Sequence, residues 1–208
     1  MKLTENEKLV TTYFEHFNKI FYGIRYSVDQ KDDYFDQDGN SLRKTFLRAP
    51  LNYRRISSRY SGRRYHPVQK RYKAHLGTDY AAAAGTPIHS VGEGVVVEAK
   101  YGRYNGNYVK IKHSSTYSTQ YLHMQKIKRG IRPGVQVEQG QTIGFVGSTG
   151  LATGPHLCFR FWKNNKQVDV LKVDLPPSDP INPKTLIDFL HEKNRIIKKL
   201  EQLSFIAP

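Results

Sequence analysis

A small set of side chains in the middle of this sequence has the types and spacing needed to hold a metal ion. Alternate side chains of a strand face opposite ways, so a strand beginning at His156 would project His156 and Cys158 from one face. His75 and Asp79 lie four residues apart, and Gly77 lets the backbone bend so that both can converge outside a helix. Imidazole, carboxylate and thiolate bind zinc, and three protein ligands leave one position open for water. The pattern predicts a catalytic zinc site that contains His75, Asp79 and Cys158.

A further histidine offers a means of proton transfer. Alternation in the segment Tyr121-Leu122-His123 puts Tyr121 and His123 on the same face of a strand. A histidine beside an activated water can act as a general base or stabilise a developing oxyanion. Each element alone also has a simpler interpretation, because histidines are often structural and free cysteines are commonly buried. Their joint occurrence in one short, glycine-rich span favours a site.

The elements that must position these residues are short strands. Between about residues 51 and 174, segments rich in β-branched and aromatic residues alternate with glycines. The expected strands are Gly94 to Lys100, Asn107 to Lys112, Ser118 to Met124, Gln141 to Val146 and His156 to Trp162. No amphipathic pattern of helical length interrupts this span, so the sequence predicts a mainly β core.

Helices are expected on both sides of this core. Residues 3 to about 20 carry a capping-box pattern and apolar residues at helical spacing. A strand over 22–29 and a turn at 38–40 follow. Near the other end, Asn182 suits a helix N-cap with Pro183 at the first helical position. We expect this C-terminal helix to pack on the β core or on another chain.

Changes of composition divide the chain into three expected parts. Residues 1–50 are a helix and strand segment, interpreted as the end of a longer accessory region. Ala49-Pro50 marks the start of a β domain over 51–175. Residues 176–208 are a Pro-rich linker and the C-terminal helix.

The charge of the chain indicates an anionic partner or environment. The sequence contains 33 Lys and Arg against 18 Asp and Glu, a formal net charge of +15. Basic residues are densest between Arg54 and Lys73, where tyrosines are interleaved. For this stretch we favour a solvated loop that borders a groove over a specific nucleic-acid site. Anionic cell-envelope polymers are compatible partners.

The sequence lacks the patterns of a membrane span, an internal disulfide and a signal peptide. No apolar run reaches the length of a membrane span. A single cysteine cannot form an internal disulfide. The first residues lack the pattern of a signal peptide, so we expect either a cytoplasmic protein or a piece without its export signal.

Six motifs in a fixed order give residues 53 to 174 a family resemblance. They are His75-x-Gly77-x-Asp79-Tyr80, Gly85-Thr86-Pro87-Ile88, Gly92-Glu93-Gly94-Val95, Tyr121-Leu122-His123-Met124, Gly140-Gln141-x-Ile143-Gly144 and Thr149-Gly150-x-x-x-Gly154-Pro155-His156-Leu157. Together they resemble the M23 family of zinc metallopeptidases, of the lysostaphin and LytM type. The resemblance implies an antiparallel β-sheet core and a zinc-dependent endopeptidase that hydrolyses peptide bonds in bacterial peptidoglycan, in stem peptides or cross-bridges. It also implies a place in the cell envelope, periplasmic or secreted.

The same resemblance implies roles for individual residues. His75 and Asp79 correspond to zinc ligands, and Cys158 stands at the position of the third ligand. His123 and His156 correspond to the catalytic pair that does not bind metal. The resemblance also places Tyr121 near this pair and makes the basic stretch that contains Arg64 a border of the substrate cleft.

The departure from the family pattern is Cys158, where the family has histidine. Thiolate is a good zinc ligand, so we expect metal binding to persist, although a thiolate makes the metal a weaker Lewis acid. Two alternatives to the peptidase follow. One is a catalytically weak or inactive LytM-type domain that binds cell wall or regulates other wall hydrolases. The other is a cysteine hydrolase with Cys158 as nucleophile and His156 as base, which leaves His75 and Asp79 without a role.

Overall fold

The chain divides into two compact units. The computed structural model describes residues 11–16, 19–28, 31–42, 44–66, 70–175 and 179–204. One unit joins Met1–Thr45 to Leu175–Pro208, and the other is Phe46–Asp174. Where we expected three parts, the N-terminal and C-terminal segments therefore share one unit.

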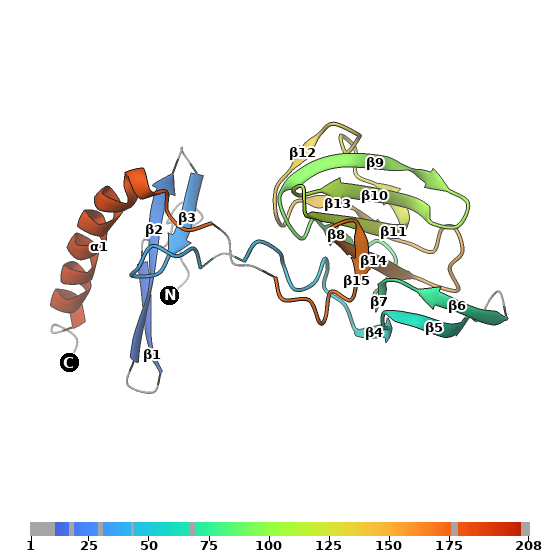
Figure 1. Cartoon of the computed structure of the whole chain (residues 1–208), viewed down its shortest axis with the longest axis horizontal. Coiled ribbons are helices and arrows are strands. Elements are labelled where there is room, and N and C mark those ends of the chain that lie inside the picture. The colour runs from blue at the N-terminus through green and yellow to red at the C-terminus, as the bar shows by residue number, and fades with distance from the viewer. Residues whose placement is uncertain are drawn as a thin grey trace. The chain divides into compact units, whose positions relative to one another are not determined.

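The unit Phe46–Asp174 is built on a ten-stranded sheet whose strand pairings are all antiparallel (Figure 1). Its main path has the order β12-β9-β10-β11-β14-β7-β4, and β8, β13 and β15 pair beside it. The strands are β4 (Arg55–Ser58), β7 (Thr78–Ala81), β8 (Pro87–His89), β9 (Gly94–Gly102), β10 (Gly106–Lys112), β11 (Tyr117–Ile127), β12 (Gln136–Val137), β13 (Thr142–Val146), β14 (His156–Lys163) and β15 (Lys166–Val168). The mainly β, antiparallel fold and the five strands expected from the sequence are confirmed.

The two faces of β14 carry different side chains. Leu157, Phe159 and Phe161 are at most 2 % exposed and lie in the core of the unit. Each such buried side chain contributes roughly 2 kcal/mol to stability. His156 and Cys158 point from the opposite face, where they line a pocket. The alternation expected for this strand is confirmed, and the packed core face fixes the orientation of the pocket face.

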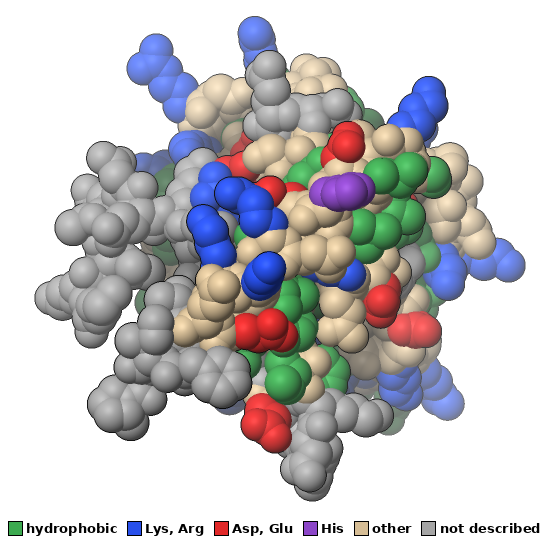
Figure 2. Space-filling model, turned by 90° about the vertical axis from the view of Figure 1, so that its left-hand side faces the viewer, with side chains coloured by type: hydrophobic (Ala, Val, Ile, Leu, Met, Phe, Trp, Pro, Cys, Tyr) green, Lys and Arg blue, Asp and Glu red, His purple; other side chains and the backbone are tan. Residues whose placement is uncertain are grey.

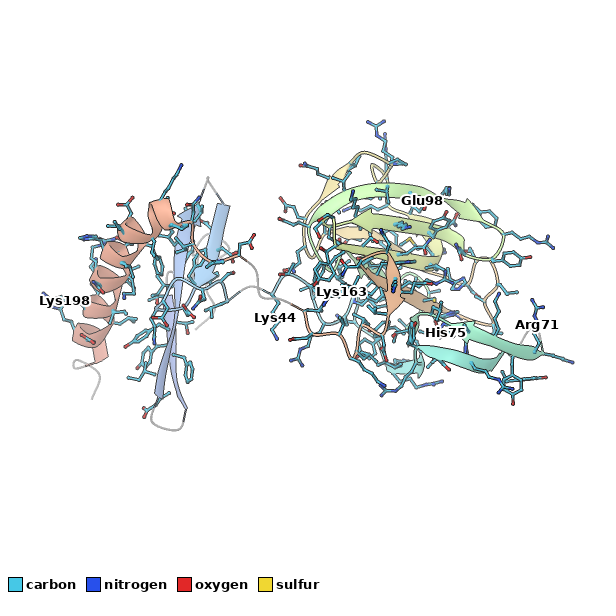
Figure 3. The ribbon with its side chains drawn as sticks, in the orientation of Figure 1. Lys44, Arg71, His75, Glu98, Lys163 and Lys198 are labelled. Carbon is cyan, nitrogen blue, oxygen red and sulfur yellow. The ribbon has the colours of Figure 1, made fainter. Side chains whose placement is uncertain are left out.

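A separate two-stranded hairpin carries the first histidine of the predicted metal site. It consists of β5 (Ser61–His66) and β6 (Arg71–His75), paired antiparallel. His75 ends β6 where the chain returns to the main sheet, and Arg71 lies farther out along the hairpin (Figure 3).

Gly77 connects this hairpin to β7 in a space too narrow for a side chain. A Cβ atom at Gly77 would lie 2.9 Å from the backbone oxygen of Phe159 and 3.2 Å from Cys158 Sγ. The glycine lets β6 and β7 approach β14 closely, which brings His75 and Asp79 beside Cys158.

The other unit contains a three-stranded sheet of β1 (Thr11–His16), β2 (Lys19–Val28) and β3 (Lys31–Phe35). The helix expected over residues 3–20 is wrong for the described part, since residues 11–16 and 19–20 are strand. Thr11 pairs with Ile24 in the β1–β2 ladder. The run of threonine and aromatic residues in β1 favours a strand, and this pairing outweighs the helical spacing of the apolar residues. Residues 1–10, with the capping-box pattern, lie outside the described residues.

The helix α1 (Pro183–Ser204) covers this small sheet. Asn182 caps it as expected, because its side-chain oxygen accepts the N–H of Lys184 at 3.0 Å. Phe189 is fully buried and its ring lies 5.9 Å from that of Phe35. The apolar face of α1 packs on β2 and β3 of its own unit.

The outer face of α1 mixes side chains of different kinds. Figure 2 shows basic, acidic and apolar side chains interspersed on the face of the molecule that carries this helix. Among the described residues, no helix is long and apolar enough to cross a membrane.

Candidate metal centre

Three potential metal ligands converge at the junction of the hairpin with the large sheet. His75, Asp79 and Cys158 each offer one donor atom, and these atoms lie within 4.8 Å of one another. His75 Nε2 is 2.9 Å from Asp79 Oδ1 and 3.7 Å from Cys158 Sγ. Asp79 and Cys158 are register partners on β7 and β14, so their side chains share one face.

The donor set fits zinc. His75 Nδ1 lies 3.1 Å from the backbone oxygen of Arg59. Because a carbonyl only accepts, Nδ1 carries a proton, and Nε2 turns toward the Asp79 carboxylate. Two acceptors 2.9 Å apart require a proton or a cation between them. One nitrogen, one oxygen and one sulfur are ligands that zinc accepts, and the bond from Nδ1 to a carbonyl orients the ring for metal binding.

The charges at the cluster are strongly coupled. Burial pushes the pKa of Asp79 upward, but the hydrogen bond and charge of His75 outweigh burial and hold this pKa below its usual value. Burial raises the pKa of the Cys158 thiol, and the Asp79 carboxylate raises it further. A nucleophilic cysteine needs the opposite shift. The local electrostatics therefore disfavour the cysteine hydrolase and suit a thiol that loses its proton to a metal.

Two further histidines lie next to each other beside this cluster. The rings of His123 and His156 have centroids 4.8 Å apart. His123 Nδ1 donates to the backbone oxygen of Thr149 at 2.8 Å, and His156 Nδ1 donates to that of Gly154 at 2.8 Å. Both Nδ1 atoms carry the proton, so both Nε2 atoms are free to accept one. Burial lowers the pKa of His123 to about 4, which keeps this ring neutral at pH 7.

His123 reaches the pocket because β11 is irregular at this point. His123 has a positive φ of 63°, and the registers of β11 with β10 and β13 both shift nearby. Such a bulge breaks the alternation of side chains along a strand. Sequence reasoning assumed a regular strand and placed Tyr121 and His123 on the same face.

Tyr121 does not line the pocket, so its expected role near the catalytic pair stays a prediction without a contact to support it. Its side chain is 0 % exposed, on the core face of the sheet. Its hydroxyl accepts the N–H of Val91 at 3.0 Å and lies 3.0 Å from Thr119 Oγ1. Tyr121 is a structural core residue.

A pocket of about 160 Å³ brings the remaining predicted residues together. Six of the predicted residues line it, namely Arg64, His75, Asp79, His123, His156 and Cys158. Arg160 and residues from β6 and two loops complete the lining. Arg64 Nη2 lies 3.7 Å from Asp79 Oδ2.

Sequence reasoning missed Arg160, although a signal was present. Arg160 follows His156 and Cys158 at the next alternate position of β14, so the same alternation places it on the pocket face. Tyr104 and Asn105 also line the pocket, from the turn between β9 and β10, and no pattern in the sequence indicates this.

Comparison with known proteins gives the site a context. Residues 73–170 match the model of Peptidase family M23. The chain is 46% identical over 176 residues to the peptidoglycan DD-endopeptidase ShyC of Vibrio cholerae serotype O1. The aligned residues cover 85% of this chain and 40% of ShyC. The chain thus spans well under two thirds of the length of this curated relative.

Two solved structures show the same fold. A zinc containing peptidase from Vibrio cholerae superposes with a TM-score of 0.60 at 37% identity, over 81% of this chain and 51% of that one. A mutant catalytic domain of the prophage-encoded M23 protein EnpA from Enterococcus faecalis has a TM-score of 0.50 at 32% identity, over 60% of this chain and 95% of that one. The EnpA catalytic domain, an M23 protein, is thus matched over nearly its whole length. Together with the match to the family model, this shows that the chain belongs to peptidase family M23.

Proposed function

We propose that this chain is a zinc-dependent endopeptidase that hydrolyses peptide bonds in bacterial peptidoglycan, in stem peptides or cross-bridges. The observation that supports this most is one pocket that joins three zinc-type donors to two histidines with free Nε2 atoms. Membership of family M23 and the similarity to a protein named peptidoglycan DD-endopeptidase point to the same substrate.

His75, Asp79 and Cys158 are the residues that hold zinc in this proposal. Zinc bound by these residues would supply a Lewis acid for a scissile carbonyl and for a water molecule. The carbonyl of Arg59 keeps the His75 ring in the orientation that ligation needs. Gly77 keeps β6 and β7 close enough to β14 for all three ligands to meet.

His123 and His156 move the proton. One Nε2 accepts the proton of the attacking water and, once protonated, donates it to the departing amine. Anchoring of each Nδ1 to a backbone carbonyl fixes the direction of the free nitrogen. Because the rings are 4.8 Å apart, a charge on one disfavours a charge on the other. The pair therefore carries at most one additional proton, on one of its two Nε2 atoms, at a time.

The setting of this activity follows from the substrate. Peptidoglycan lies in the cell envelope, so we propose an envelope location for the chain. The exposed basic hairpin of β5 and β6 suits the anionic polymers found there.

The test is metal analysis of purified protein together with digestion of purified peptidoglycan, with and without a chelator. We expect about one zinc per chain and a release of new amino termini that the chelator stops. If the protein contains zinc but releases no new amino termini, the chain is a cell-wall-binding domain and not a peptidase. Absence of zinc, with a cleavage that thiol alkylation abolishes, would overturn the proposal.

Two variants sharpen this test. His156→Ala should keep zinc and lower kcat by about 10²-fold to 10⁴-fold, because a proton acceptor is lost. Asp79→Ala should lose zinc and cleavage together. His191→Ala, at an exposed position of α1, is the matched control and should change neither quantity.

A further inference from the structure

Two guanidinium groups lie in the same pocket as the metal cluster. Arg64 comes from β5 of the hairpin and Arg160 comes from β14 of the large sheet. Both side chains line the pocket that also contains His123 and His156. The charge of Arg160 and a hydrogen bond from it lower the pKa of Cys158, but they leave the buried Nε atoms of Arg160 and Arg64 without an explanation.

Arg160 has hydrogen-bonding capacity that the protein does not use. Its Nε is buried and has no hydrogen-bond partner among the described residues. No carboxylate of those residues lies within 4.0 Å of its guanidinium. A buried donor without a partner costs free energy, and a charged one costs more. An anionic ligand would remove this cost.

Arg64 is in a similar state. Its Nε is also buried without a hydrogen-bond partner. Its nearest acidic group is Asp79, at 3.7 Å between Nη2 and Oδ2, which is too long for a hydrogen bond. Asp79 is moreover the residue that the metal uses. The guanidinium of Arg64 therefore remains available to a ligand.

We propose that Arg160 and Arg64 bind a free carboxylate of the peptide substrate, which makes this an endopeptidase for acidic peptides. This inference rests on the proposed function. A guanidinium presents paired N–H groups that match the two oxygens of a carboxylate. Asp79 is the one acidic residue among those that line the pocket, and it belongs to the metal cluster. An incoming carboxylate would thus meet both guanidinium groups, with Lys73 also on the pocket wall, and no competing free anion.

The spacing along β14 locates this carboxylate on the substrate. Arg160 is two residues from the ligand Cys158, a separation of about 7 Å along a strand. An extended peptide advances about 3.4 Å per residue. The carboxylate therefore belongs to a residue within about two positions of the scissile bond. A polyanion bound only on the outer surface would not reach it.

The experiment compares two cross-linked peptides of peptidoglycan type that differ only in their free carboxylates, which are amidated in one of them. Binding of each peptide is measured by titration calorimetry with zinc-loaded and with metal-free protein, and kcat/KM is measured with the zinc-loaded protein. We expect wild-type protein to bind the carboxylate form about tenfold more tightly than the amidated form. Arg160→Gln should lose this preference by binding the carboxylate form about tenfold less tightly, with little change for the amidated form.

Controls separate this inference from the proposed function. Arg132→Gln removes the same charge at an exposed site outside the pocket and should keep the preference. Arg160→Lys should retain part of it. Equal affinity of wild-type protein for both peptides, or an equal loss for both in Arg160→Gln, would overturn the inference. If the carboxylate preference is present but neither peptide is cleaved, the carboxylate-binding role of the two arginines is supported and the endopeptidase proposal fails.

Discussion

Asp79 and Cys158 face each other as register partners on β7 and β14, so a carboxylate and a thiol are held side by side on the pocket face. Burial and the neighbouring carboxylate both raise the pKa of Cys158. These two side chains would both be ligands of a divalent cation, which would favour the thiolate form of Cys158. The register of β14 with β7 thus places the Cys158 thiol where it can be a third ligand.

The first prediction concerns this sulfur. Cys158→Ser keeps the size of the side chain and removes the thiolate, so we expect zinc affinity to fall by more than about 100-fold. Competition with a chromophoric chelator measures this affinity. The cobalt-substituted wild-type protein should show a sulfur-to-metal charge-transfer band that Cys158→Ser lacks.

Cys158→His is the matched variant. Imidazole donates less charge than thiolate, so this variant should retain zinc and cleave peptidoglycan at least as fast as wild-type protein. Equal zinc affinity for wild-type protein and Cys158→Ser would contradict the assignment of Cys158 as a ligand.

The second prediction concerns the space at Gly77. A Cβ at this position would lie 2.9 Å from a backbone oxygen and 3.2 Å from Cys158 Sγ, so the strands must move apart. Gly77→Ala should lower the free energy of unfolding by about 1–3 kcal/mol and weaken zinc binding. Urea unfolding and chelator competition measure the two effects.

Gly62→Ala is the control, because a Cβ at Gly62 meets no atom within 4 Å. Gly62 lies on β5 of the hairpin, so a glycine in the same region is replaced without the steric conflict. A similar loss of zinc affinity in both variants would show that the close approach at Gly77 is not what matters.

The success of sequence reasoning depended on the regularity of each strand. His156 and Cys158 were placed correctly on one face because β14 is regular and its other face is filled by Leu157 and Phe159. Tyr121 was misplaced because the positive φ of His123 breaks the alternation in β11. A bulge of this kind depends on pairing with two neighbouring strands, which a local pattern does not contain.

The N-terminal segment shows a second limit of local patterns. Apolar residues between positions 9 and 20 fit helical spacing, but residues 11–16 pair with β2 instead. Strand formation here depends on tertiary contacts of β2 with α1, which is distant in sequence. The helix α1 itself was predicted because its N-cap, Asn182, is a local signal.

The third prediction is a dependence of stability on pH. His113 Nδ1 donates to the backbone oxygen of Glu93 at 2.6 Å, and its Nε2 lies 2.7 Å from Thr119 Oγ1. Burial lowers the pKa of His113 to about 4, from 6.5 in an exposed histidine. The unfolded chain therefore binds a proton at a higher pH than the folded chain does. The contribution of His113 to the free energy of unfolding should be complete above pH 6.5, fall between pH 6.5 and about 4, and not change further below that.

Urea unfolding of metal-free protein over this range measures the effect. The loss due to His113 should be at most about 3 kcal/mol, and His123, whose pKa is also lowered to about 4, adds to it. His113→Gln should show a shallower pH dependence, whereas His191→Gln, at an exposed position of α1, should match wild-type protein. An unchanged slope in His113→Gln would contradict the prediction.

The fourth prediction compares two buried tyrosine hydroxyls. The Tyr80 hydroxyl is buried and has no hydrogen-bond partner among the described residues, and burial raises its pKa to about 12. The Tyr121 hydroxyl accepts the N–H of Val91 and contacts Thr119. Removal of an unpaired buried hydroxyl is neutral or favourable, whereas removal of a paired one leaves its partners unsatisfied.

Tyr80→Phe should therefore leave the free energy of unfolding unchanged or raise it by about 1 kcal/mol, and Tyr121→Phe should lower it by about 1–3 kcal/mol. Both variants keep the aromatic ring, so packing in the core is the same and urea unfolding reports the hydroxyl alone. Both should also keep full zinc content, because neither side chain lines the pocket. If Tyr121→Phe instead weakened peptide binding with no loss of stability, Tyr121 would have the role at the active site that its burial argues against.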